Sequence, residues 1–133
     1  MKEINELNIP DDRRYSADHE WARFEGENVR IGISDYAQDQ TGEIVYVELP
    51  AVGDRFDRNQ VCGVVESVKS VSDLLIPVGG EVAAVNSGLE KTPNLVNESP
   101  YENGWLIEVK PTAKREMDDL MNAAEYIEML KGE

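Results

Sequence analysis

Three side chains limit the chemistry that this sequence can support: one histidine, His19, one cysteine, Cys62, and a lysine, Lys69, placed between two strand-like segments. A nucleophile–histidine triad would have to use His19, because the chain has no other imidazole. His19 stands in the segment Asp18-His19-Glu20-Trp21 at the entry to a predicted strand, which favours a structural role. We therefore expect a protein that is not an enzyme.

Motifs for other reaction and metal sites are also missing. The sequence has no glycine-rich phosphate loop, no HExxH, no nucleophile elbow and no calcium-loop pattern. The acid pairs Asp11-Asp12 and Asp118-Asp119 are expected to point in diverging directions and to be solvated, so no metal site is predicted. A lone Cys62 excludes an internal disulfide and a multi-cysteine metal centre, and it is expected to be buried as a small apolar residue.

Composition and charge narrow the class of protein further. A chain of 133 residues is the size of one domain, and its 13 basic and 27 acidic residues give a net charge of −14. That charge repels nucleic acid. The sequence has no apolar stretch long enough for a membrane span, and its first residues resemble neither a signal nor a transit peptide. We expect a cytoplasmic protein, without nucleic-acid or membrane partners, that acts as a monomer.

Lys69 is the residue whose setting is most unusual. It lies between the small or β-branched residues Ser67, Val68, Ser70 and Val71, at the predicted tip of a hairpin. Taken by itself, an exposed lysine in a turn is most simply a solubilising residue. The alternative is an attachment point, since an ε-amine on a rigid, protruding turn can be presented to a ligase and acylated by a cofactor.

The elements that would hold this turn are mainly β-strands. Alternating or β-branched segments predict strands near residues 21–24, 29–33, 43–49, 61–68, 73–76, 81–85 and 105–109. A short helical turn is expected from Ser34 to Gly42, and the tail after Pro111 is expected to form two helices that divide at the capping box of Asn122. Many short strands with frequent turns indicate an antiparallel sandwich or flattened barrel.

The predicted organisation has three parts: a polar lead-in over residues 1–14, a β domain over residues 15–111, and C-terminal helices over residues 112–133 packed on the same domain. Residues 42–47 and 80–85 resemble each other, which suggests a repeated β unit around the lysine hairpin.

The segment from Gly63 to Asp73 resembles the lipoyl-lysine segment of the glycine cleavage system H protein family. The likeness covers about residues 15 to 130 and extends to further motifs. These motifs include His19-Glu20-Trp21, Gly42-Glu43-Ile44-Val45-Tyr46-Val47-Glu48-Leu49-Pro50 and Pro100-Tyr101-Glu102-Asn103-Gly104-Trp105.

The resemblance implies a lipoyl-domain-like, hammerhead-type β fold and a lipoate joined by an amide to Lys69. It implies a carrier that moves an aminomethyl group between glycine decarboxylase, aminomethyltransferase and dihydrolipoyl dehydrogenase, after modification by a lipoate ligase or lipoyltransferase. Glu66 and Asp73 flank the turn and are candidates for recognition by the ligase or by a partner enzyme. Glu20 and Asp73 match positions that line the cleft for the loaded arm in the family.

Three other functions remain open at this point. An H-like lipoate-binding protein of bacterial sulfur oxidation, serving a heterodisulfide-reductase-like complex, would share the Lys69 motif. The residues Tyr36, Gln40 and Thr41 keep this alternative open, because some relatives have histidines at Tyr36 and Gln40. A biotin carrier is disfavoured because biotinyl lysines usually lie between methionines. An unmodified interaction module would leave Lys69 free.

Overall fold

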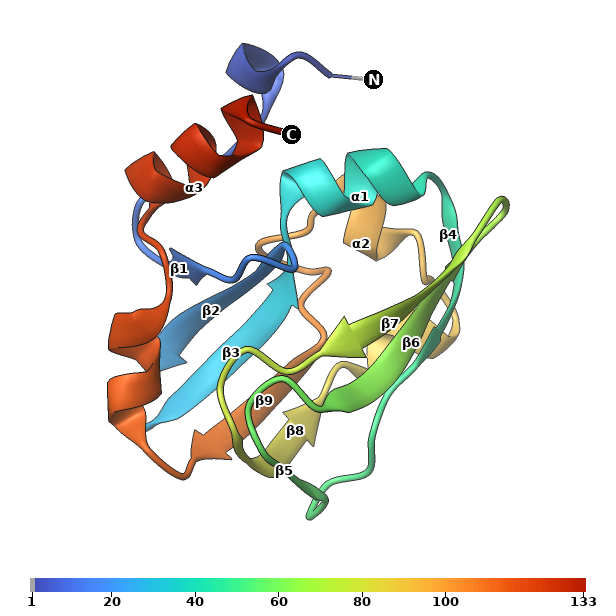
Figure 1. The fold of residues 1–133 in the computed structure, drawn as a ribbon. Coiled ribbons are helices and arrows are strands. Elements are labelled where there is room, and N and C mark those ends of the chain that lie inside the picture. Colours follow the sequence, from blue (N-terminus) through green and yellow to red (C-terminus); the bar gives the residue numbers. More distant parts are fainter. Residues whose placement is uncertain (1) are drawn as a thin grey trace.

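The computed structural model describes residues 2–133 and shows two antiparallel β-sheets that pack face to face, with short helices around them (Figure 1). The larger sheet has the strand order β1 (Arg14–Tyr15), β2 (Glu20–Glu25), β3 (Asn28–Ile33), β9 (Ile107–Pro111), β8 (Gly80–Val85) and β5 (Arg55–Phe56). The smaller sheet has the order β4 (Ile44–Glu48), β6 (Val61–Ser67) and β7 (Val71–Leu75). The predicted β-sandwich is confirmed.

The helices of residues 2–133 are short. The α-helices are α1 (Asp35–Thr41), α2 (Leu95–Glu98) and α3 (Ala123–Lys131), and the 3-10 helices are η1 (Ile4–Glu6), η2 (Ser87–Glu90) and η3 (Lys114–Asp119). The predicted boundaries of α1 are confirmed: the Ser34 hydroxyl accepts a hydrogen bond from the backbone N–H of Ala37, and the helix ends at Gly42, whose φ of 87° suits glycine.

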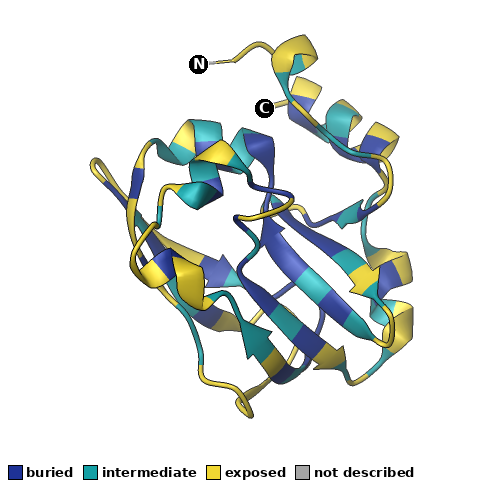
Figure 2. Cartoon of the chain, turned by 180° about the vertical axis from the view of Figure 1, so that it is seen from behind, coloured by how far each residue is buried: buried dark blue, intermediate teal, exposed yellow. Residues whose placement is uncertain are grey.

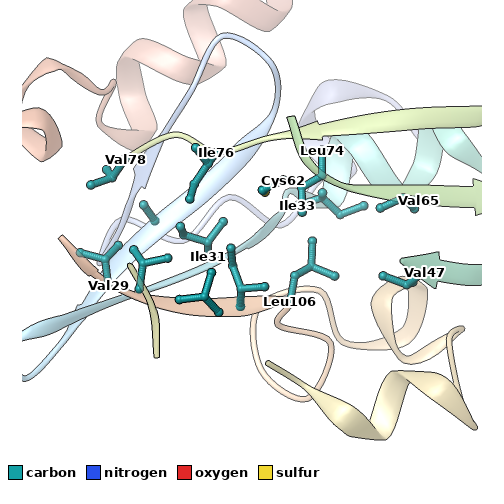
Figure 3. Packing of buried hydrophobic residues seen from close by; sticks show 14 of the residues in the cluster. Val29, Ile31, Ile33, Val47, Cys62, Val65, Leu74, Ile76, Val78 and Leu106 are labelled. Carbon is teal, nitrogen blue, oxygen red and sulfur yellow. The ribbon is translucent and has the colours of Figure 1, made fainter. Parts of the chain in front are cut away.

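The main core lies between the two sheets, where apolar side chains of both inner faces meet (Figure 3). Ile31 and Ile33 of β3 come from the larger sheet, and Val65 of β6 and Leu74 of β7 come from the smaller one. Full burial of an aliphatic side chain of this size contributes about 1.5–3 kcal/mol to folding. This shared core fixes the β6–β7 hairpin to the rest of the molecule.

A second, aromatic cluster joins the C-terminal helix to the edge of the larger sheet. The rings of Tyr15 in β1 and Tyr126 in α3 stack with their centroids 4.6 Å apart. Trp21 is fully buried, and its indole N–H donates to the carbonyl of Pro100 at 3.0 Å. Figure 2 shows the strands of the larger sheet mostly in the colours of buried and half-buried residues.

The tail divides at Asn122, as the capping box predicts. The Asn122 side chain accepts from the backbone N–H of Glu125, and the Glu125 carboxylate accepts from the backbone N–H of Asn122, both at 2.9 Å. The first tail segment is a 3-10 helix, η3. The backbones of Tyr15 and Met121 exchange hydrogen bonds at 2.8 and 2.9 Å, so the tail is tied to the first strand. The division of the chain at residues 14 and 111 stays a prediction.

Some boundaries and pairings differ from the sequence expectations. β7 begins at Val71 rather than at residue 73, and β9 begins at Ile107 rather than at residue 105. Trp105 therefore lies outside the strand, half-buried beneath the Arg30 guanidinium, whose carbon is 4.6 Å from the ring centroid. The two similar segments, 42–47 and 80–85, contribute to different sheets, because β4 pairs with β6 whereas β8 pairs with β5 and β9.

Candidate functional site: an exposed lysine turn beside a small cleft

The β6–β7 hairpin ends in a three-residue turn, Val68-Lys69-Ser70, that carries Lys69 on its exposed tip (Figure 1). Ser67 closes the turn from below. Its backbone N–H donates to the Ser70 carbonyl at 2.8 Å, and its hydroxyl oxygen accepts from the backbone N–H groups of Lys69 and Ser70 at 3.2 and 3.0 Å. The turn is therefore ordered locally although its three residues are exposed.

A second contact joins the turn to the neighbouring strand. The backbone N–H of Val68 donates to the carbonyl of Glu43 at 3.1 Å, just before β4 begins. Val68 and Val71 are 70% and 66% exposed, and Tyr46 of β4 is 52% exposed, so apolar surface surrounds the lysine. A solvent-exposed amine on an anchored turn is accessible to a modifying enzyme.

A cleft of about 170 Å³ opens beside this turn, between α1 and β7. Its polar walls come from three parts of the chain: residues 18–20 before and in β2, residues of α1, and residues at the start of β7. The lining residues are Asp18, His19, Glu20, Ile33, Tyr36, Ala37, Gln40, Thr41, Val65, Ser72, Asp73 and Leu74. The cleft thus brings together Glu20 and Asp73, two of the residues singled out in the sequence.

Glu20 is an acid of the cleft whose pKa departs strongly from its ordinary value. Its side chain is almost completely buried, and burial raises the pKa of its carboxyl to about 8. One oxygen accepts a hydrogen bond from the Ser16 hydroxyl at 2.7 Å. At neutral pH Glu20 is therefore mostly protonated.

His19 forms one end of the cleft and is held by contacts that the sequence did not reveal. Its Nδ1 lies 2.8 Å from the Tyr126 hydroxyl, which in turn lies 2.7 Å from the Ser34 hydroxyl. Its Nε2 is 3.4 Å from a carboxylate oxygen of Glu133. Burial lowers the pKa of His19, and its φ of 72° is unusual for a residue other than glycine. These contacts suit a residue that orders the cleft wall.

Glu66 lies elsewhere. It is half-buried in β6 between Tyr46 of β4 and Val71 of β7, its neighbours across the small sheet. Because the adjacent residues Val65 and Ser67 are buried, strand alternation places Glu66 on the outer face of the small sheet, near the turn and away from the cleft. The sequence candidates therefore form two groups, one on the hairpin surface and one in the cleft.

The sequence predicts a buried Cys62 and no metal site. Cys62 is buried at 6% exposure, as expected, and burial raises the pKa of its thiol to about 12. Within residues 2–133 no group of three or more histidine, cysteine, aspartate or glutamate side chains is arranged to hold a metal ion. No helix in that same range is long and apolar enough to cross a membrane.

Comparison with known proteins gives one consistent result. The family profile described as Glycine cleavage H-protein matches residues 13–133. The glycine cleavage system H protein of Halalkalibacterium halodurans is 50% identical over 126 residues, which cover 95% of this chain and 98% of that protein. The corresponding protein of a Thermus thermophilus strain is 50% identical over 127 residues, covering 96% and 99%.

A solved structure agrees with this result. The crystal structure of a glycine cleavage system H protein from Mycobacterium marinum superposes with a TM-score of 0.85 at 39% sequence identity. The match covers 92% of this chain and 99% of that one.

Proposed function

Because the chain belongs to the glycine cleavage system H protein family, a family of lipoyl carriers, we propose that its lipoate is attached through an amide bond to Nζ of Lys69. The observation that carries the proposal is the position of this amine, exposed at the tip of a turn that Ser67 and Glu43 hold in place. Attachment would remove one positive charge. In residues 2–133 no carboxylate forms an ion pair with Lys69, so the fold would lose little.

The carrier role distributes the chemistry between the protein and its partners. Lipoate supplies the disulfide that takes up an aminomethyl group, whereas the chain presents the arm and binds the enzymes. Membership of the glycine cleavage system implies three partners, and we propose that they are glycine decarboxylase, aminomethyltransferase and dihydrolipoyl dehydrogenase. A lipoate ligase or lipoyltransferase would attach the cofactor.

We assign the cleft to the loaded arm between visits to these enzymes. An aminomethyl group carries an amine, and a cation that enters the cleft would meet Asp73 and the buried carboxyl of Glu20. A nearby positive charge favours the ionised carboxylate, so Glu20 would release its proton as the cation arrives. Tyr36 and Gln40 also line the cleft.

Recognition by the modifying enzyme is assigned to two acids of the hairpin, Glu66 on its outer face and Asp73 in the wall of the cleft. Glu66 precedes Lys69 by three residues and Asp73 follows it by four, one in each strand of the hairpin. Both are held in fixed register with the turn by the β6–β7 pairing. A ligase that contacts these two acids would recognise Lys69 by its fixed position between them along the hairpin.

The other functions considered from the sequence have no support from the relatives. The family profile and the compared proteins all carry the glycine cleavage name, which favours aminomethyl transfer over sulfur oxidation and over biotin transfer. Whether Lys69 is modified, rather than free, is decided by experiment.

The test uses intact mass followed by loading. The purified chain is treated with lipoate, ATP and a lipoate ligase, and the mass should rise by one lipoyl group. Purified glycine decarboxylase and glycine should then add the aminomethyl group. Lys69→Arg should fold but remain unmodified and unloaded, while the exposed control Lys91→Arg should behave like the native protein. A lipoylated Lys69→Arg protein would contradict the assignment.

A further inference from the structure

The side chain of Lys69 does not extend freely into solvent but lies over the backbone of Gly42, the residue that ends α1. A Cβ built on Gly42 would be 3.0 Å from Cε of Lys69, 3.8 Å from its Cδ and 3.6 Å from its Nζ. The outer half of the lysine stem therefore occupies the space that any other residue at position 42 would fill.

The surface beneath the lysine is rigid. The Asn97 side chain donates to the Gly42 carbonyl at 2.8 Å and to the Gln38 side chain at 3.0 Å, and it accepts from the backbone N–H of Ile44 at 2.9 Å. One amide thus ties the end of α1 to the start of β4. The lysine lies on a backbone segment whose position is fixed from both sides.

This segment borders the cleft. Thr41, which precedes Gly42, and Gln40 both line the cleft, and the wall continues along α1 to Ala37 and Tyr36. A helix rises about 1.5 Å per residue, so the path from Gly42 to Tyr36 runs about 9 Å along α1. A stem that lies on Gly42 starts beside one end of that path.

We infer that Gly42 is a positioning residue for the lipoyl arm. Because glycine has no side chain, the Lys69 stem can pack against the backbone at this position, and this packing directs the arm along α1 into the cleft. The contact between Lys69 and Gly42 is present in the unmodified protein, whereas its effect on the arm rests on the proposed attachment of lipoate to Lys69. A long arm on a freely rotating stem searches a large volume. A stem held on Gly42 raises the local concentration of the arm at the cleft without any added contact to the arm.

The variant that tests the inference is Gly42→Ala, and the chain offers a matched control. Gly42 and Gly53 both have positive φ, 87° and 98°, so alanine introduces backbone strain at each. At Gly53 a Cβ would meet nothing within 4 Å, whereas at Gly42 it meets the flexible end of Lys69. Gly53→Ala therefore also places an alanine at a positive φ, without disturbing the lysine.

The first measurement is made on unmodified protein by nuclear magnetic resonance. Native protein and Gly53→Ala should show nuclear Overhauser contacts between the Lys69 methylenes and residue 42, and Gly42→Ala should lose them. Absence of these contacts in the native protein would overturn the inference, even if Gly42→Ala failed to fold.

The second measurement follows the backbone amide signals of Ala37, Gln40 and Thr41 in lipoylated protein before and after glycine-dependent loading. Loading should shift these signals in the native protein and in Gly53→Ala, and the shifts should shrink by at least half in Gly42→Ala at equal loading by mass. Shifts of full size in Gly42→Ala would overturn the role in directing the arm. If the native protein is not lipoylated or loaded, the proposed function fails, while the contact between Lys69 and Gly42 is still decided by the first measurement.

Discussion

The hydroxyl of Ser16 donates a 2.7 Å hydrogen bond to the carboxyl of Glu20, at the buried end of a cleft beside the lysine turn. Ser16 also accepts a hydrogen bond from the backbone N–H of Glu20 at 3.1 Å. The first bond holds the carboxyl directly, and the second fixes the hydroxyl that donates to it, while burial of the carboxyl favours the neutral form. The cleft contains an acid that can change its charge near neutral pH.

The pKa of Glu20 makes stability depend on pH. Its folded-state pKa of about 8 lies above the ordinary value of 4.5, so between these values the folded chain binds more protons at this site than the unfolded chain. Stability from this site therefore falls as pH rises through that window. Glu20→Gln should gain stability relative to the native protein, on the order of 1–3 kcal/mol between about pH 5 and pH 9, by urea unfolding. A stability difference between Glu20→Gln and the native protein that does not change with pH would contradict this prediction.

Cys62 should be unreactive in the folded protein. Its thiol is 6% exposed and its pKa is raised to about 12, so little thiolate forms near pH 8. A thiol reagent such as dithionitrobenzoate should label Cys62 only after unfolding in guanidinium. Cys62→Ser should lower the free energy of unfolding by roughly 1–3 kcal/mol, because a hydroxyl replaces an apolar side chain in the core, yet leave aminomethyl transfer unchanged. Fast labelling of native protein, or lost transfer in a folded Cys62→Ser, would disprove this account.

The cap of α3 should contribute measurably to stability. Asn122→Ala removes the side-chain half of the capping box and should reduce the free energy of unfolding by about 1 kcal/mol. Asn94 precedes α2 but makes no side-chain capping bond, so Asn94→Ala is a matched control with a smaller expected effect. Equal losses in the two variants, measured by urea unfolding, would show that the capping bond is not the cause.

The net charge of −14 should accelerate encounters with positively charged enzyme surfaces. At carrier concentrations far below saturation, the rate of loading by glycine decarboxylase should fall roughly three- to tenfold between about 0.05 and 0.5 M NaCl, because salt screens the attraction. The rate at saturating carrier should change much less. If the loading rate at low carrier concentration does not change with salt, electrostatic steering does not contribute to the encounter.

Much of the fold could be predicted because its signals are local. The alternation in residues 29–33 indicates β3, and Ser34 and Gly42 mark the ends of α1. The two-residue strands β1 and β5 were missed, since so short a segment has no periodicity. The start of β9 was also misplaced, because Trp105 continues the alternation of the strand but packs against Arg30.

The candidate site likewise has features that the local sequence predicts and contacts that it does not predict. The residues around Lys69 predicted its hairpin, whereas the attachment of lipoate to Lys69 followed from the resemblance to the glycine cleavage system H protein family and stays a prediction. The environment of His19 was not predicted, because Tyr126 and Glu133 reach it from the other end of the chain. The contact of Lys69 with Gly42 likewise joins residues that only the packing of the turn onto α1 brings together.

The ends of the described chain lie close to each other, because η1 and α3 are in contact, and Figure 1 shows both ends beside α3, apart from the tip of the β6–β7 hairpin. Neighbouring ends are the geometry in which a short linker can join them without strain. The protein is therefore suited to circular permutation, with the old ends joined and new ones opened at a distant loop such as residues 51–54. A permuted or surface-tethered carrier of this kind would keep the Lys69 turn unobstructed.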